Sequence, residues 1–167
     1  SPPDRRAGGG LSSGDEAARG AERLIYGLDT NILIYMLDPL CPENERCSSI
    51  LDRLSREFLI AVNPTTIHEA YTVLVYARKW ERDEALGRLT TLLRDPYVKF
   101  YNQTRDATIL GLHLANKYAI RGRDALILSN LLVNKVDAIY THDEEVKKLG
   151  EVTWRDKRLV VEDPVTS

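Results

Sequence analysis

Short apolar segments alternate with amphipathic segments along most of this chain, and this alternation constrains the fold more than any other feature. Five short runs have the composition of strands, and apolar residues at helical spacing fill the segments between them. The strand-like runs cover 24–28, 58–62, 97–101, 138–140 and 159–161. The helical patterns cover 32–37, 43–57, 67–75, 83–93, 104–118 and 124–134, with a short one from Asp143. Strands separated by helical crossovers predict an α/β fold, a three-layer arrangement with a central, mostly parallel sheet flanked by helices.

The first 23 residues differ in composition from the rest of the chain. Five of the ten glycines and two of the seven prolines lie there, and Leu11 is the only large aliphatic residue. Such a segment cannot bury enough apolar surface to offset the entropy lost when it becomes ordered. We therefore expect a flexible Gly-rich arm over residues 1–23 and one folded domain over residues 24–163.

Charge, apolar runs and cysteines exclude several classes of protein. Lys and Arg number 23 against 25 Asp and Glu, so the formal net charge is −2, which argues against binding nucleic acid by bulk basicity. The longest apolar run, 32–37, is far shorter than the ~20 residues of a membrane span. Cys41 and Cys47 have neither zinc-knuckle nor redox spacing. We expect a cytoplasmic protein that has no membrane partner.

Four acidic residues stand at or near the ends of the predicted strands. Asp29 ends the first strand and Asp143 follows the fourth, while Glu69 and Asp124 lie near the starts of helices. The carboxyl ends of parallel strands meet at one edge of a sheet. A group of carboxylates without thiolates suits Mg²⁺ or Mn²⁺, and the corresponding chemistry is hydrolysis of a phosphodiester.

The same acids are also compatible with a purely structural role at helix starts. The segments Thr66–Glu69 and Thr141–Glu144 each have the pattern of a capping box. Asp29 has the position of an N-cap, and Asp124 that of an acid favoured in the first helical turn. The residues alone leave the catalytic and the structural interpretation open.

Four short motifs in a fixed order resemble those of the PIN-domain ribonucleases, and especially the VapC-type toxins of prokaryotic toxin–antitoxin pairs. They are Asp-Thr-Asn at 29–31, Thr-Thr-Ile-His-Glu-Ala at 65–70, Gly-Arg-Asp-Ala-Leu-Ile-Leu at 122–128 and Thr-His-Asp at 141–143. The resemblance covers nearly all of residues 24–163 and implies a PIN-like fold. It also implies a Mg²⁺- or Mn²⁺-dependent endoribonuclease, in which four acids hold the metal and activate water: Asp29, Glu69, Asp124 and Asp143.

The resemblance assigns supporting roles to other polar residues. Thr141 would orient metal-bound water, and Asn31 would steady the site. RNA also needs positive charge near the acids, because neutralising phosphates dominates its affinity. Lys117, Arg121 and Arg123 lie close to the third acid in the sequence and are the candidate RNA contacts.

Partners follow from the resemblance as well. It implies an antitoxin protein that lays a helix in an apolar groove, with Tyr35, Tyr71 and Trp80 as its expected lining, and a homodimer. The segments Tyr71–Ala77 and Ile109–Ala115 are the expected dimer contacts. Two alternatives keep the fold: a PIN-domain nuclease that processes RNA, and a non-catalytic PIN-like module that binds RNA or protein.

Overall fold

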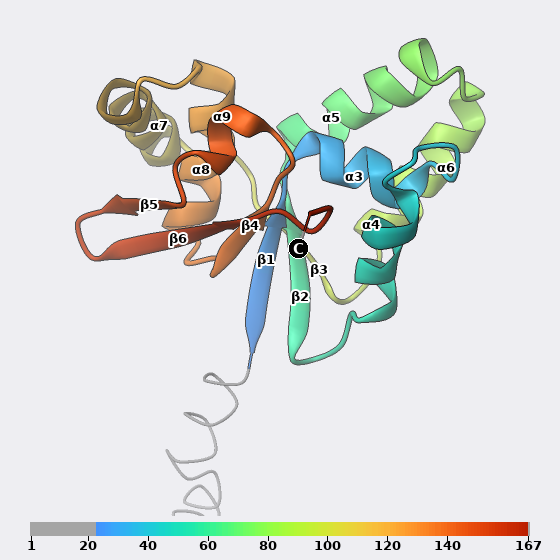
Figure 1. Cartoon of the computed structure of the whole chain (residues 1–167), viewed down its shortest axis with the longest axis horizontal. Coiled ribbons are helices and arrows are strands. Elements are labelled where there is room, and N and C mark those ends of the chain that lie inside the picture. Colours follow the sequence, from blue (N-terminus) through green and yellow to red (C-terminus); the bar gives the residue numbers. More distant parts are fainter. Residues whose placement is uncertain (1–22, 167) are drawn as a thin grey trace, which may run out of the picture.

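The computed structural model describes residues 23–166, so the arm predicted for residues 1–23 lies outside the described residues except for Arg23. The strands are β1 (Leu24–Leu28), β2 (Phe58–Val62), β3 (Val98–Phe100), β4 (Ala138–Tyr140), β5 (Glu151–Trp154) and β6 (Lys157–Glu162). The helices are α3 (Thr30–Leu37), α4 (Asn44–Asp52), α5 (Pro64–Thr72), α6 (Arg82–Leu93), α7 (Arg105–Tyr118), α8 (Gly122–Val133) and α9 (Glu144–Lys147), and a π-helical turn, η1 (Val73–Ala77), extends α5 (Figure 1). Within these residues every helix is too short or too polar to cross a membrane.

The strands of the described residues form one sheet in the order β3-β2-β1-β4-β6-β5. All neighbouring pairs are parallel except β5 and β6, which confirms the mostly parallel sheet. From β1 the chain crosses to β2 on one side and later enters β4 on the other. The carboxyl ends of β1 and β4 therefore border the switch point of the sheet, where open α/β proteins place their sites.

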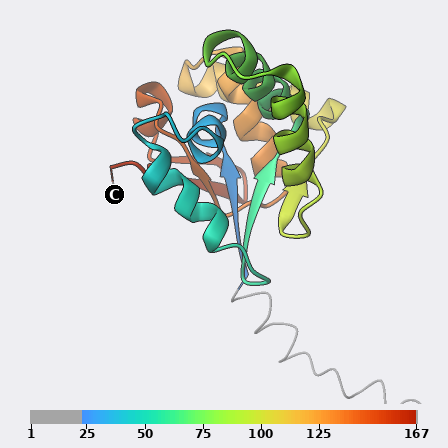
Figure 2. The same cartoon turned by 90° about the vertical axis from the view of Figure 1, so that its right-hand side faces the viewer.

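Helices cover both faces of this sheet, as the three-layer prediction requires. Along β2, Ile60 and Val62 belong to a core shared with α3, α4, α5 and α6, whereas Ala61 between them belongs to a second core shared with α7 and α8. This alternation follows from the two-residue period of a strand. Figure 2 shows the first group of helices in front of β1 and β2.

One glycine brings a helix unusually close to the sheet. A Cβ atom at Gly27 in β1 would lie 2.3 Å from Cδ1 of Leu131 in α8, so the missing side chain makes room for this helix. Close packing of α8 on β1 matters for the site, because Asp124 lies in the first turn of α8 and Asp29 follows β1 directly.

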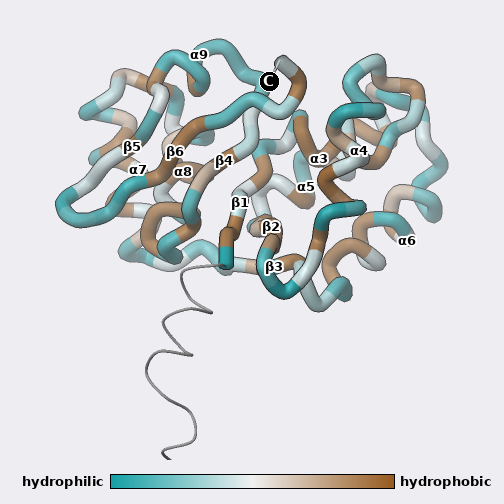
Figure 3. Tube along the Cα trace, turned by 60° about the horizontal axis from the view of Figure 1, so that its bottom comes forward, coloured by the Kyte–Doolittle hydropathy of each residue, from teal (hydrophilic) through white to brown (hydrophobic). Residues whose placement is uncertain are grey.

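The C-terminal part of the sheet is a hairpin that the sequence pattern did not predict. A single strand was expected at 159–161, but β5 precedes it and pairs antiparallel with β6. Arg155 takes a φ of 57° at the first position of the two-residue turn, where glycine is usual, so the turn lacks its ordinary sequence signal. This turn is among the polar, teal segments of Figure 3.

Candidate active site

Asp29 lies at the carboxyl end of β1 and is the N-cap of α3. Its Oδ1 accepts a hydrogen bond from the Thr30 backbone N–H (2.8 Å), and its Oδ2 accepts one from the Thr141 hydroxyl (2.7 Å). Asp29 is only 6% exposed, and Thr141 is fully buried. Asp29 is therefore both the predicted N-cap and a predicted site residue. Its position is fixed by β1, which it follows, and by Thr141, which follows β4.

Glu69 points from α5 toward α3 and α8. The capping-box interpretation of Thr66–Glu69 is wrong, because α5 begins earlier: Asn63 is the N-cap, and Asn63 and Thr66 form the reciprocal capping box. Glu69 lies beyond the first turn of α5, which frees its carboxylate for other contacts. Its Oε1 accepts a hydrogen bond from the Thr30 hydroxyl (2.8 Å), and its Oε2 pairs with Arg123.

Asp143 follows β4 and is the N-cap of α9. Its Oδ1 accepts hydrogen bonds from the backbone N–H groups of Glu145 (2.9 Å) and Val146 (3.1 Å). The predicted capping box of Thr141–Glu144 is wrong, since Thr141 precedes the cap and bonds elsewhere. Its hydroxyl donates to Asp29 and accepts from the Asp143 backbone N–H (3.1 Å), so this one group links two of the acids.

Asp124 lies in the first turn of α8, whose N-cap is Arg121 without a side-chain cap. It is 7% exposed, and one of its oxygens lies 3.5 Å from the Arg123 guanidinium. Asp29 and Asp124 together line a narrow recess against the core of the domain.

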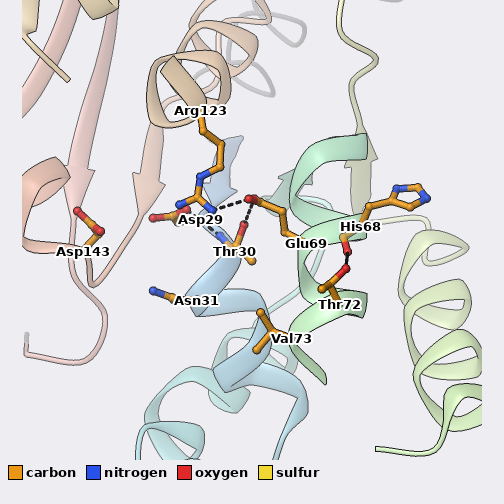
Figure 4. Close-up of a pocket in the computed structure, with 9 residues that line it drawn as sticks. All are labelled: Asp29, Thr30, Asn31, His68, Glu69, Thr72, Val73, Arg123 and Asp143. Atoms are coloured by element: carbon orange, nitrogen blue, oxygen red, sulfur yellow. Dashed lines mark hydrogen bonds and ion pairs between the residues drawn. The ribbon is translucent and has the colours of Figure 1, made fainter. Parts of the chain in front are cut away.

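Three of the four acids line a cavity of ≈ 390 Å³ at the switch point, and the fourth lies beside it. Asp29, Glu69 and Asp143 line the cavity together with Asn31 and Arg123, and Asp124 adjoins it through Asp29. Figure 4 shows Asp143 on one side of Asp29 and Glu69 on the other. Side chains from α3, α5, α8 and the β4–α9 connection, far apart in the sequence, thus surround one space.

The buried acids of this site are electrostatically strained. Burial raises the pKa of Asp29, and the charges of Asp124 and Asp143 raise it further, against hydrogen bonds from Thr141 and Thr30 that lower it. Burial also raises the pKa of Asp124, with the charge of Asp143 adding to it and that of Arg123 opposing it. Carboxylates that repel one another in this way are stabilised by a cation.

The three cations predicted to contact RNA occupy different places. Arg123 lines the cavity, and Arg121 stands at the N-cap of the same helix. Lys117 bonds to the Thr153 backbone carbonyl (3.0 Å) and lies over the Trp154 ring, so its position serves the contact between α7 and the β5–β6 hairpin.

The donor set of this site suits a hard divalent cation, since every candidate ligand is a carboxylate or hydroxyl oxygen. The distances between these candidate ligands, however, are too long for direct metal binding. Within residues 23–166 no three acidic, His or Cys side chains are placed close enough to hold a metal ion as they stand. The residue types therefore fit Mg²⁺ or Mn²⁺. In this structure, however, the positive charge beside the acids is that of Arg123.

Two residues, one in the site and one beside it, were not singled out from the sequence. Thr30 connects Asp29 to Glu69, through its N–H and its hydroxyl respectively. Asp163 follows β6 and pairs with His142 (2.8 Å), the residue between Thr141 and Asp143. Because Asp163 is also an acid at the end of a parallel strand, the signal that identified Asp29 was present there too.

These features define a three-layer α/β protein with an acidic cavity at the switch point of its sheet. The family model of the PIN domain matches residues 26–152, and the chain belongs to this family. No curated protein matches the chain.

Solved structures of VapC toxins and toxin–antitoxin complexes share the fold. VapC20 of Mycobacterium tuberculosis, a toxin that cleaves the sarcin-ricin loop, has a TM-score of 0.64 at 14% identity, over 78% of this chain and 98% of that one. VapBC2 of Rickettsia felis, bound to promoter DNA, has a TM-score of 0.62 at 17% identity, over 84% and 98%. FitAcB of Neisseria gonorrhoeae has a TM-score of 0.54 at 16% identity, over 86% and 100%.

Proposed function

We propose that this protein is an endoribonuclease that uses Mg²⁺ or Mn²⁺ to hydrolyse RNA phosphodiester bonds, and that it is the toxin of a toxin–antitoxin pair. The observation that supports the proposal is that three carboxylates, Asp29, Glu69 and Asp143, line one cavity, while Asp124 shares an adjoining recess with Asp29. Helix capping accounts for Asp29 and Asp143. It does not account for Glu69, which caps no helix among the described residues, or for the burial of Asp124.

The residues of the cavity have distinct parts in this reaction. Bound Mg²⁺ or Mn²⁺ would activate water and neutralise charge on the phosphate oxygens. Asp29 and Asp124 offer the buried carboxylates, and Asp143 offers the more exposed one. Thr141 fixes the orientation of Asp29 by hydrogen bonding. Asn31, exposed at the rim, presents an amide that can donate to a phosphate oxygen.

The direct test is RNA cleavage by the purified chain. We expect fragments from ribosomal RNA in the presence of Mg²⁺ or Mn²⁺, no fragments with EDTA, and recovery when excess Mn²⁺ is added back. Ribosomal RNA is a suitable first substrate because VapC20 cleaves the sarcin-ricin loop. RNA binding without cleavage at any metal concentration would instead favour the non-catalytic module.

An antitoxin partner is supported by the relatives and by a second cavity. Several neighbours in fold are toxin–antitoxin complexes. A cavity of ≈ 540 Å³ between α5 and α6 is lined by Tyr71, Leu86, Leu89 and other apolar residues, with Arg82 and Asp83 also on its wall. His68 lines both this cavity and the acidic one. An amphipathic helix seated here would end beside the acids. Of the other two predicted lining residues, Tyr35 and Trp80, neither borders this cavity; both pack against the core.

A homodimer is proposed on the exposed apolar side chains of α7. Ile109 and Leu112 are 47% and 68% exposed, within the segment predicted as a contact. We expect Leu112→Glu to convert a dimer to a monomer of half the mass in light scattering at micromolar concentration, because a buried carboxylate opposes association. Thr91→Glu, an equally acidic change on the exposed side of α6, should leave the dimer intact. A monomeric wild-type chain would contradict the proposal.

A further inference from the structure

Arg123 supplies the positive charge that the acids of the cavity face in this structure. Its Nη1 pairs with Glu69 Oε2, and its Nη2 lies 3.5 Å from Asp124 Oδ1. The two carboxylates come from α5 and α8, which pack into different cores on the two faces of the sheet. Figure 4 shows the guanidinium reaching across the cavity beside Asp29. Arg123 therefore bridges two of the four residues that the proposed function assigns to a metal ion.

Glu69 is fully engaged in this arrangement. Its Oε1 accepts the Thr30 hydroxyl hydrogen bond and its Oε2 holds Arg123, so each carboxylate oxygen already has a partner. A metal ion that took Glu69 as a ligand would have to replace at least one of these contacts.

The ion pair between Arg123 and Glu69 is easily exchanged. The Arg123 side chain is 55% exposed, so its ion pair with Glu69 is open to water on one side and water can replace it. Asp29 and Asp124 are buried and line one recess, so a nearby positive charge stabilises their carboxylates. The Arg123 guanidinium can thus move away at little cost, while the buried carboxylates beside it remain stabilised by any cation that takes its place. This is the arrangement expected of an exchangeable counter-ion.

We propose that the Arg123 guanidinium and the divalent cation compete for the same carboxylates, so that Arg123 leaves Glu69 when the metal binds. This inference rests on the proposed function for the identity of the ion. In the metal-free protein Arg123 limits the repulsion among the acids. The same contact lowers the affinity for metal below that of the carboxylates alone, so Arg123 sets the metal concentration at which the site fills.

The experiment is a Mn²⁺ titration of the full chain by isothermal calorimetry, without RNA. We expect Arg123→Gln to bind Mn²⁺ about tenfold more tightly than the wild type, which corresponds to about 1.4 kcal/mol. Arg121→Gln is the matched control, because it removes the same charge from the same end of α8, and Arg121 acts on Asp124 through its charge without bridging to Glu69. We expect less than a threefold change there. Thermal melts without metal should show Arg123→Gln below Arg121→Gln, and Mn²⁺ should reverse that order.

The outcomes separate the inference from the function on which it rests. Equal affinities for all three proteins, or weaker binding by Arg123→Gln, would overturn the competition while leaving the metal site in place. No Mn²⁺ binding by any of the three would overturn the metal site itself, and the proposed function with it. A loss of folding in Arg123→Gln would appear in the melts and in circular dichroism, and Arg123→Met then offers a second neutral side chain of similar length.

Discussion

Asp29→Asn is expected to abolish metal-dependent RNA cleavage without destabilising the metal-free protein. Asp29 follows β1 directly and lines the cavity, where the Thr141 hydroxyl holds its carboxylate. Residues that only orient metal ligands typically contribute roughly 10–100-fold to activity or affinity, and replacing a ligand itself should reduce cleavage by at least about 100-fold. The measurement is the initial rate of RNA cleavage at saturating Mn²⁺.

The same substitution should leave the stability of the metal-free protein unchanged or increase it. Burial and neighbouring charges raise the pKa of Asp29 in the folded state above its unfolded value. A carboxyl of this kind weakens folding as pH rises from the unfolded toward the folded pKa, and at neutral pH its ionised form is a net destabilising charge. Asparagine has the same shape without the charge; it keeps an oxygen for the Thr30 N–H but loses the acceptor of the Thr141 hydroxyl, which offsets part of the gain. We therefore expect an equal or higher melting temperature without metal, and a smaller increase on adding Mn²⁺.

The exposed Asp52 at the end of α4 provides the control for this pair of measurements. Asp52→Asn makes the same charge change outside the cavity and should alter neither cleavage nor the Mn²⁺-induced shift. Cleavage by Asp29→Asn at the wild-type rate would contradict the proposed role of the acids. A large fall in its melting temperature would show that the Asp29 contacts are structural rather than strained.

The sheet and the order of the acids could be predicted because both depend on local patterns. Buried parallel strands appear as short apolar runs, and Asp29 and Asp143 each stand at the end of one. Parallel pairing then brings those ends together whatever the details of packing. Neither conclusion required knowledge of any contact between side chains.

The partners of Glu69 could not be predicted, because they are distant in the chain. The Thr66–Glu69 pattern and the Asn63–Thr66 pattern both describe possible caps, and they overlap by one residue. Glu69 is drawn to Thr30 and Arg123, which lie 39 and 54 residues away. Arg123 was predicted as an RNA contact from its place beside Asp124, but its bridge to Glu69 depends on how α5 and α8 approach each other across the sheet.

The contacts of Asp163 likewise could not be predicted from the sequence. Replacing Asp163 has the largest effect on stability that we predict. Its carboxylate pairs with His142 and with Lys147 (both 2.8 Å), at the two ends of the segment that contains Asp143, and it accepts from the Val165 N–H (2.8 Å). Burial raises the pKa of Asp163, but hydrogen bonds from Lys147 and His142 lower it well below the ordinary range. The carboxylate thus fastens the β4–α9 connection to the end of β6.

Asp163→Ala is expected to lower the free energy of unfolding by about 2–3 kcal/mol at pH 7. Breaking a fully buried pair typically costs roughly 3–5 kcal/mol, and the effect here is smaller because the side chains of His142 and Lys147 are 28% and 24% exposed. Urea unfolding provides the measurement. Asp156→Ala in the β5–β6 turn, where the side chain is 91% exposed, is the control and should stay within about 0.5 kcal/mol of wild type.

The pH dependence distinguishes charge from packing as the origin of this loss. Because the folded pKa of Asp163 lies below its unfolded value of about 3.9, its contribution is fully present above that value and disappears as pH falls toward the folded pKa. The difference between wild type and Asp163→Ala should therefore persist at about pH 5 and above and shrink below about pH 4. A difference that stayed the same at pH 3 would mean that Asp163 acts through packing, and that the segment carrying Asp143 is held by something other than this carboxylate.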